Sequence, residues 1–504
     1  MRGYPFVIVF LSFLIASCGQ HQSSAEGKSE QPNIIIIYAD DLGYGDPGAY
    51  GGTAIKTPNI DRLAAEGVRF TRGYASSATC TPSRYAILTG TYPWRNERAH
   101  ILPGSASLII DTLQITIPKM LKKQGYATGI VGKWHLGLGS GEIDWNRHIS
   151  PGPNEVGFDY SFILAATQDR VPTVYIENGN VVGLDPEDPI EVSYRHAFQG
   201  EITGKEHPEL LKMGLSQGHD GTIVNGISRI GHMKGGKQAR WIDENMADTF
   251  LVKAQHFIIT HKDQPFFLYY ALQQPHVPRT PHPRFVGRTE LGPRGDVIAE
   301  ADWCIGELIK TLENQGVFNN TLIIFSSDNG PVLDDGYRDG AFEKNGNHKP
   351  WGPFRGGKYS LYEAGTRLPF ITFWPGHIQP AVSDAMVSQI DLLNSLAALT
   401  GSEEQSADGK NLMETFLGKT KQGRDDLIFE AMGKTGYRKG EWVMIPPYPG
   451  PAFAEDVQIE LGNSDKYQLY HLQNDLGQRV NLADSLPDKL AEMITEYEQI
   501  KKND

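Results

Sequence analysis

The chain has 504 residues, of which 39% are hydrophobic and 21% are charged, and its formal net charge is -13. This length and composition support one large core and a second, smaller domain, and they exclude an intrinsically disordered chain. Because lysine and arginine do not gather in one run, neither nucleic acid nor an anionic membrane surface is expected as a partner. An anionic substrate must therefore be held by local positive charge.

The first residues have the features of an export signal. Arg2 precedes an apolar stretch over residues 6–16, which is too short to span a membrane and has the length of a signal peptide. It runs into IASC at residues 15–18, which resembles a bacterial lipobox with Cys18 as the lipidated residue. The alternative is an ordinary signal peptide with an incidental cysteine.

The expected N-terminal organisation follows from this pattern. Residues 1–18 are predicted to be a lipoprotein signal peptide, and the Ser-, Gln- and Glu-rich residues 19–31 a flexible tether. The protein is expected to be exported to the periplasm or cell envelope of a bacterium. Its only membrane contact would be the lipid on Cys18.

Four short apolar runs predict strands of a parallel sheet that is buried on both faces. They cover residues 33–38, 126–131, 265–271 and 321–325. Helical patterns lie among them, so the predicted fold class is α/β. The clearest helical patterns cover residues 58–67, 118–124, 247–260 and 297–312.

Polar side chains follow all four runs. They are Asp40 and Asp41, Lys133 and His135, His276, and Asp328 with Asn329. Because open α/β sheets bind ligands beyond the carboxyl ends of their strands, we expect these side chains to converge. A single carboxylate there is more often a cap or turn residue. The two pairs offer only hard oxygen ligands, which suit Ca²⁺ or Mg²⁺ rather than zinc, and we favour calcium.

Cysteine usage draws attention to Cys80. The chain has only three cysteines, so a disulfide framework is not expected. Cys18 is explained by export, and Cys304 lies in a helical pattern that predicts a core position. Pro82 favours the first turn of a helix, so Cys80 is predicted at a helix N-terminus, where partial positive charge would lower a thiol pKa. A thiolate nucleophile with a distant histidine base is one interpretation.

The sequence around Cys80 resembles the signature of the type I sulfatase family. The run CTPSR at residues 80–84 is followed by LTG at residues 88–90. Further motifs stand in the family's order: YADDLG at 38–43, GKWHLG at 132–137, QPH at 274–276, SDNG at 327–330, RGGK at 355–358 and LYHLQND at 469–475. The resemblance runs from about residue 32 to the C-terminus.

The resemblance implies an alkaline-phosphatase-like sandwich over residues 32–423, with a large mixed, mostly parallel sheet flanked by helices. A smaller C-terminal α+β domain with a four-stranded antiparallel sheet is expected over residues 424–504. Short strand patterns at 427–429, 442–445 and 466–472 and a helical pattern at 487–500 agree with this expectation.

The resemblance also implies the chemistry of a sulfuric ester hydrolase. Cys80 would be oxidised to formylglycine by a formylglycine-generating or anaerobic sulfatase-maturating enzyme. One calcium ion would be bound by Asp40, Asp41, Asp328, Asn329 and the modified Cys80. Arg84 would steady the hydrated aldehyde, and Lys133 and Lys358 would hold sulfate oxygens. His135 would handle the diol proton, and His276 would protonate the leaving alcohol.

The substrate is expected to be a sulfated carbohydrate or polysaccharide. Residues 156–241, with DRVP at 169–172 and WID at 241–243, are similar to bacterial sulfatases that act on sulfated polysaccharides. Asp169, Arg170 and His219 are the candidate substrate-binding residues in this segment. Two alternatives stay open: a phosphomonoester or phosphonate hydrolase of the same superfamily, and a non-catalytic lipoprotein that binds sulfated glycans.

Overall fold

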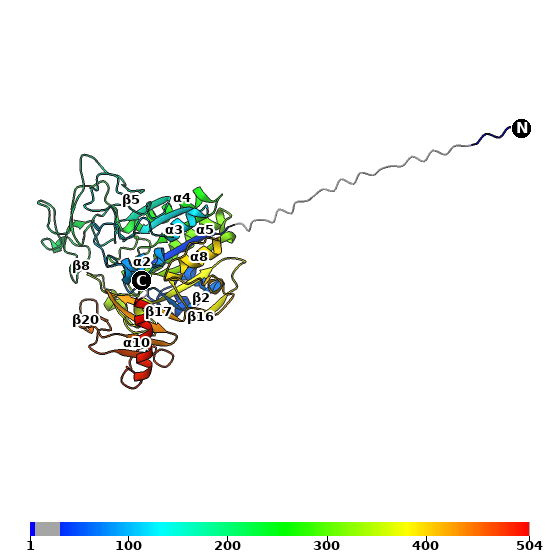
Figure 1. Ribbon diagram of the computed structural model, residues 1–504. Coiled ribbons are helices and arrows are strands. Elements are labelled where there is room, and N and C mark those ends of the chain that lie inside the picture. The colour runs from blue at the N-terminus through cyan, green and yellow to red at the C-terminus, as the bar shows by residue number, and fades with distance from the viewer. Residues whose placement is uncertain (6–30, 503–504) are drawn as a thin grey trace. The chain divides into compact units, whose positions relative to one another are not determined.

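The computed structural model describes residues 1–5 and 31–502 (Figure 1). Cys18, almost all of the predicted tether and most of the predicted signal peptide lie outside these residues. Residues from Pro32 onward form one compact unit. Within the described part of the chain, no helix combines the length and apolar character needed to cross a membrane.

A ten-stranded mixed sheet forms the centre of this unit, in the spatial order β16-β2-β15-β13-β1-β12-β3-β4-β5-β6. The four predicted strands are direct neighbours in it and pair in parallel. They are β13 (Thr321–Ser327), β1 (Asn33–Ala39), β12 (Phe266–Ala271) and β3 (Ala127–Lys133). The others are β2 (Val68–Tyr74), β4 (Tyr160–Leu164), β5 (Ile176–Glu177), β6 (Asn180–Val181), β15 (Arg367–Phe373) and β16 (Ala381–Ser388).

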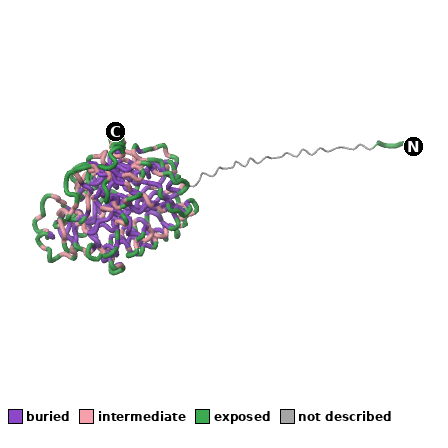
Figure 2. Tube along the Cα trace, turned by 90° about the horizontal axis from the view of Figure 1, so that it is seen from below, coloured by how far each residue is buried: buried purple, intermediate pink, exposed green. Residues whose placement is uncertain are grey.

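Helices cover both faces of this sheet. Alternate residues of a strand point to opposite faces, so Ile34 and Ile36 pack in one buried cluster and Ile35 and Ile37 in another. The first cluster includes residues of α2 (Cys80–Thr89), α3 (Ile117–Lys123) and α8 (Leu392–Thr400). The second includes residues of α1 (Pro58–Glu66), α4 (Met246–His261) and α5 (Pro293–Asn314). Figure 2 shows the buried residues gathered inside and the exposed ones at the periphery.

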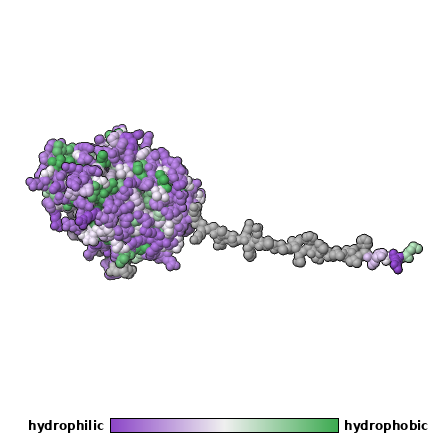
Figure 3. Space-filling model, turned by 90° about the horizontal axis from the view of Figure 1, so that it is seen from above, coloured by the Kyte–Doolittle hydropathy of each residue, from purple (hydrophilic) through white to green (hydrophobic). Residues whose placement is uncertain are grey.

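Small elements lie outside the central sheet. The short helices are α6 (Ala341–Lys344), α7 (Glu363–Thr366) and α9 (Met413–Phe416). The strand pairs are β7 (Glu191–Ser193) with β11 (His232–Lys234), β8 (Gly214–Leu215) with β14 (Tyr337–Arg338), β9 (Ile223–Val224) with β10 (Ile227–Ser228), and β20 (Phe453–Ala454) with β21 (Ile459–Glu460). The face drawn in Figure 3 is mostly hydrophilic, with small separate apolar groups.

The C-terminal part forms the expected four-stranded antiparallel sheet. Its order is β17 (Asp426–Ala431), β18 (Lys434–Lys439), β19 (Trp442–Ile445) and β22 (Gln468–His471). Helix α10 (Pro487–Lys502) lies beside it (Figure 1), and its Met493 joins the same buried cluster as Leu427 and Met444. The predicted domain boundary at residues 423 and 424 stays a prediction.

Candidate active site

Both predicted oxygen pairs meet at the carboxyl edge of the central sheet. Asp40 and Asp41 follow β1, and Asp328 and Asn329 follow β13, its parallel neighbour. The Asp41 N–H donates to Asp328 Oδ1 at 3.1 Å, and Asn329 Nδ2 donates to Asp41 Oδ1 at 2.7 Å. All four side chains are buried and converge, as the strand ends predict. Their role as metal ligands stays a prediction.

Three buried cations surround these oxygens. Lys133 Nζ donates to Asp40 Oδ2 at 2.6 Å, and Lys358 Nζ donates to Asp41 Oδ2 at 2.9 Å. Arg84 donates through Nη2 to Asp328 Oδ2 at 2.7 Å. Buried charges need partners of opposite sign because desolvation is costly. The cluster therefore pairs each of its three buried carboxylates with a fixed positive charge.

Two oxygen atoms of this cluster fit a bound cation. Asp40 Oδ1 and Asn329 Oδ1 are buried, and neither has a hydrogen-bond partner among the described residues. Such atoms are rare in folded proteins and call for an ion or a water molecule. Burial, followed by the charge of Asp328, raises the pKa of the Asp40 carboxyl well above its usual range. A hard cation would favour the ionised form, so these residues fit calcium.

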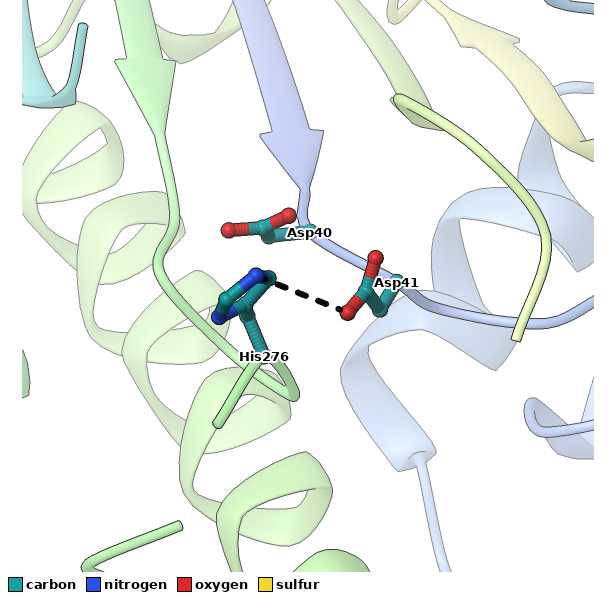
Figure 4. Close-up of side chains that lie close together, drawn as sticks. All are labelled: Asp40, Asp41 and His276. Atoms are coloured by element: carbon teal, nitrogen blue, oxygen red, sulfur yellow. Dashed lines mark ion pairs between the residues drawn. The ribbon is translucent and has the colours of Figure 1, made fainter. Parts of the chain in front are cut away.

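His276 lies against the same carboxylates. Figure 4 shows its ring, from the loop after β12, beside the two aspartates that follow β1. Ligand atoms of Asp40, Asp41 and His276 lie within 4.8 Å of one another, and His276 Nε2 is 3.9 Å from Asp41 Oδ2. The ring therefore lies within reach of a metal ion held by these carboxylates, and its predicted role as an acid stays a prediction.

The protonation state of His276 bears on its expected role as an acid. Its Nδ1 lies 2.7 Å from the Val277 carbonyl oxygen, which can only accept, so Nδ1 carries a proton. Burial, Lys358 and Lys133 lower the pKa of His276 well below its ordinary value. Nε2 must therefore gain a proton before it can donate one, and a negative charge bound beside it would favour that step.

Cys80 begins α2 and is buried, so its predicted position at a helix N-terminus is confirmed. The expected low thiol pKa is wrong. Burial raises the pKa of Cys80, although Lys133 and Lys358 act in the opposite direction. Desolvation outweighs the helix terminus here, and it disfavours an ordinary thiolate nucleophile.

His135 is held as a neutral base. Its backbone is left-handed, with φ of 57°, and its Nε2 lies 2.9 Å from the Leu102 carbonyl oxygen, to which it donates. Burial and Lys133 lower the pKa of His135 well below its ordinary value. Its Nδ1 is buried and has no hydrogen-bond partner among the described residues. A neutral imidazole with a free Nδ1 can accept a proton, as the predicted role requires.

A cavity of about 590 Å³ gathers the remaining predicted residues. Its lining includes Cys80, His276 and Lys358 together with the three substrate-binding candidates Asp169, Arg170 and His219. Arg170 Nη1 lies 2.9 Å from Asp169 Oδ1, and His219 Nε2 lies 3.0 Å from Asp169 Oδ2. The three candidates thus form one charged group in the wall of the pocket that holds the expected nucleophile.

Asp335 and Tyr359 also line this cavity, although the sequence patterns did not predict them. Asp335 Oδ2 accepts from Lys358 Nζ at 2.8 Å, and the Tyr359 hydroxyl donates to Asp335 Oδ1 at 3.0 Å. Both follow predicted residues closely, since Asp335 lies a few positions after Asn329 and Tyr359 is next to Lys358. Closeness in sequence to these predicted residues is the signal from which Asp335 and Tyr359 could have been predicted.

A second buried charge group fixes the loop that follows Asp41. Asp46 accepts from Arg294 Nη1 at 2.8 Å and Nη2 at 2.7 Å, from the Gly43 N–H at 2.7 Å, and contacts His348 Nε2 at 2.8 Å. Burial opposes ionisation, but Arg294 and His348 lower the pKa of Asp46 to about 2. This lowered pKa stabilises the fold above the ordinary aspartate pKa, and the contribution is lost as pH falls toward 2.

We therefore expect Asp46→Ala to lower the free energy of unfolding at pH 7 by roughly 3–5 kcal/mol, because it strands a buried guanidinium. Chemical denaturation measures the change. Glu66→Ala, which breaks an exposed pair with Arg62, is the matched control and should cost less than about 1 kcal/mol. Equal small losses in the two variants would show that the Asp46 cluster does not hold the loop.

The family comparison agrees with this geometry. The model of the family described as Sulfatase matches residues 32–402, which include both oxygen pairs, Cys80 and every cation of the cluster. The chain belongs to the sulfatase family. Its relatives are sulfatases, so the protein is a sulfuric ester hydrolase. The resemblance to sulfatases that its motifs indicated is confirmed.

Several relatives cover nearly the whole sulfatase chain. An N-acetylgalactosamine-6-O-sulfatase of Bacteroides thetaiotaomicron is 51% identical over 97% of both chains. Human arylsulfatase A is 32% identical over 93% of this chain and 87% of its own. A solved structure concerned with the metabolism of multiple glycosaminoglycans by Bacteroides thetaiotaomicron has 51% identity and a TM-score of 0.93, covering 94% of this chain and 100% of that one. These similarities confirm the predicted fold class.

Proposed function

We propose that this sulfatase removes sulfate from sulfated carbohydrates through a formylglycine hydrate made from Cys80, with calcium bound beside it. The observation that carries the proposal is that Cys80, Lys358 and His276 line one pocket, and that Lys358 and His276 also lie close to the buried Asp41. A maturating enzyme that oxidises the Cys80 side chain is a required partner.

The cations of the site account for sulfate binding. A sulfate ester carries its charge on peripheral oxygens, and catalysis needs fixed positive charge where that charge develops. Lys133 and Lys358 supply this charge, and each is held by a different carboxylate of the cluster. Calcium, held by Asp40, Asp41, Asp328 and Asn329 with the modified Cys80, would add a Lewis-acidic charge when bound. Arg84, held by Asp328, would steady the hydrated aldehyde.

The two histidines divide the proton transfers. His135, with its free Nδ1, accepts a proton from the hydrate, and His276, once protonated at Nε2, gives a proton to the departing alcohol. An aldehyde hydrate supplies two hydroxyl groups on one carbon, one to attack sulfur and one whose deprotonation allows sulfate to leave. A serine or cysteine lacks the second hydroxyl, which is why the modification matters.

A sulfated amino sugar is the favoured substrate. The relative with 51% identity is named an N-acetylgalactosamine-6-O-sulfatase, which favours an amino sugar. Ps i-CgsB, 25% identical with a TM-score of 0.65, was solved with k-i-k-neocarrahexaose, which supports a carbohydrate substrate in general. Asp169, Arg170 and His219 supply charged hydrogen-bonding groups in the pocket wall, suited to sugar hydroxyls. We therefore propose a 6-sulfated N-acetylhexosamine, with these three residues on its hydroxyl groups.

Parallel assays test this proposal against the phosphatase alternative. Purified, matured protein is given N-acetylgalactosamine 6-sulfate and N-acetylgalactosamine 6-phosphate at equal concentrations, and released anion is measured. We expect kcat/KM for the sulfate to exceed that for the phosphate by at least about hundredfold. A preference for phosphate would overturn the proposed function. Binding of the sulfated sugar without turnover by the matured protein would favour a non-catalytic glycan-binding role.

His276→Ala tests the assignment of the acid. We expect its turnover of sugar sulfates to fall by roughly 10²–10⁴-fold, because an alkoxide leaves poorly without a proton. The turnover of aryl sulfates whose leaving phenol is acidic should fall much less. The measurement is log kcat against the leaving-group pKa, which should become steeper in the variant. His256→Ala, on the exposed side of α4, is the control. An unchanged slope would assign the acid elsewhere.

We also propose that the protein is an exported lipoprotein of the periplasm or cell envelope, attached through a lipid on Cys18. The support is the apolar stretch over residues 6–16 and the IASC sequence that follows it. Location outside the cytoplasm would bring the pocket to polysaccharides that cannot enter the cell.

A further inference from the structure

The β17–β18 hairpin turns at an unusual residue beside the active site. Ala431 pairs with Lys434, so Met432 and Gly433 form a two-residue loop, with φ of 52° and 76°. Positive φ at both positions is the pattern of a type I′ turn, which favours Asn or Asp followed by Gly. Methionine is disfavoured at the first position because a long side chain does not relieve the left-handed backbone.

Packing does not explain this methionine. The residue is 57% exposed, so its side chain gains little from the protein interior. A disfavoured backbone conformation combined with an exposed apolar side chain indicates a function rather than a contribution to stability.

Glu430 joins this turn to the segment that leads into Cys80. One carboxylate oxygen of Glu430 accepts from the Gly433 N–H, and the other accepts from the Ser77 hydroxyl. Its backbone N–H donates to the Ser76 carbonyl at 2.9 Å, and its carbonyl accepts from the Ala78 N–H at 2.8 Å. Because Glu430 is buried, the turn is fixed relative to the nucleophile.

Met432 lines the same cavity of about 590 Å³ as Cys80, His276 and Lys358. The lining also includes Ala454 and Leu461, which belong to the C-terminal part of the chain. The C-terminal part thus contributes apolar surface to a pocket that also holds charged side chains, among them Asp169, Arg170 and Lys358. A sugar has both kinds of surface, since hydroxyl groups alternate with C–H groups around its ring.

We propose that Met432 is a specificity-determining residue whose side chain packs against C–H groups of the bound saccharide. The inference rests on the proposed function. The contacted C–H groups belong either to a face of the sugar ring or to the methyl of an acetamido group. A thioether side chain is flexible and polarizable, so it can follow such a surface closely.

Met432→Asn tests the proposal because asparagine suits the turn and should keep or raise the thermal unfolding midpoint. We expect kcat/KM for N-acetylgalactosamine 6-sulfate to fall by about tenfold, mostly through KM, since an apolar contact is lost. For 4-nitrophenyl sulfate, kcat/KM should change by less than about twofold, because this substrate reaches the nucleophile without a sugar. Met432→Leu should restore most of the sugar activity.

A second sugar separates the two sources of C–H groups. If Met432→Asn lowers kcat/KM for galactose 6-sulfate as much as for the N-acetylated sugar, the contact is to the sugar ring. If it lowers kcat/KM only for the N-acetylated sugar, the contact is to the acetamido methyl. Leu113→Asn, an exposed leucine outside the pocket, is the matched control and should change nothing. Unchanged kcat/KM on both sugars would overturn the proposal, as would equal losses on sugar and aryl sulfates. A wild-type protein inactive on both sugars but active on the aryl sulfate would overturn the proposed substrate, and the role of Met432 with it.

Discussion

Cys80→Ala is expected to lower the turnover of every sulfate ester by more than about 10⁴-fold. Alanine cannot be oxidised to the aldehyde, so the site loses its nucleophile and one predicted calcium ligand, while its lysines and histidines stay in place. Substrate binding should survive, because Lys133 and Lys358 are held by carboxylates and not by Cys80. The measurement is kcat with 4-nitrophenyl sulfate, together with the binding of a sugar sulfate by calorimetry.

Cys304 provides a matched control for this substitution. It is the other buried cysteine among the described residues, and it lies in α5 within the core cluster on one face of the central sheet. Cys304→Ala should cost some stability and leave kcat within about twofold, since a core packing loss acts on folding rather than on chemistry. Similar losses in both variants would show that Cys80 acts through the fold. Full activity of Cys80→Ala would contradict its role as nucleophile.

Removal of calcium is expected to lower turnover by at least about hundredfold, since a Lewis-acidic charge supplies several kcal/mol to the transition state. Calcium should restore activity, and zinc should not, because Asp40, Asp41, Asp328 and Asn329 offer only oxygens. The ion should also stabilise the fold. At free calcium of about 100 times Kd, the gain in unfolding free energy is about 2.7 kcal/mol.

Asn329→Ala separates the metal from other effects of chelation. The variant loses an oxygen that is buried and without a hydrogen-bond partner among the described residues, so it should need a higher calcium concentration for the same thermal shift. Asn180→Ala, at an exposed asparagine of β6, is the control and should keep the wild-type calcium dependence. Unchanged activity and melting temperature in protein shown to be free of metal would contradict the predicted ligand set.

The strand ends of the site could be predicted because they depend on local pattern and on one rule of topology. Continuous apolar runs identified β1 and β13, and the parallel arrangement placed Asp40 and Asp328 at one edge. Strand β18 was missed because Lys434, Arg438 and Lys439 hide its pattern. Its pairing is fixed by the neighbouring strands, which a local pattern does not contain.

Electrostatics and the outer wall of the pocket could not be predicted in the same way. The effect of a helix N-terminus on the Cys80 pKa was overestimated, because burial depends on tertiary packing. Met432 carries no chemistry that marks it as a pocket residue, and it reaches the site only through the docking of the C-terminal sheet. Such contributions depend on contacts between distant segments.

Mass spectrometry of the peptide containing Cys80, taken from protein made in its native host, tests the proposed nucleophile most directly. The predicted result is an aldehyde in place of the CH2–SH group of Cys80. The fraction of molecules that carry it should equal the fraction that is active on sulfate esters. Reagents specific for aldehydes should not label this peptide in Cys80→Ala. An unmodified thiol in fully active native protein would contradict the proposal.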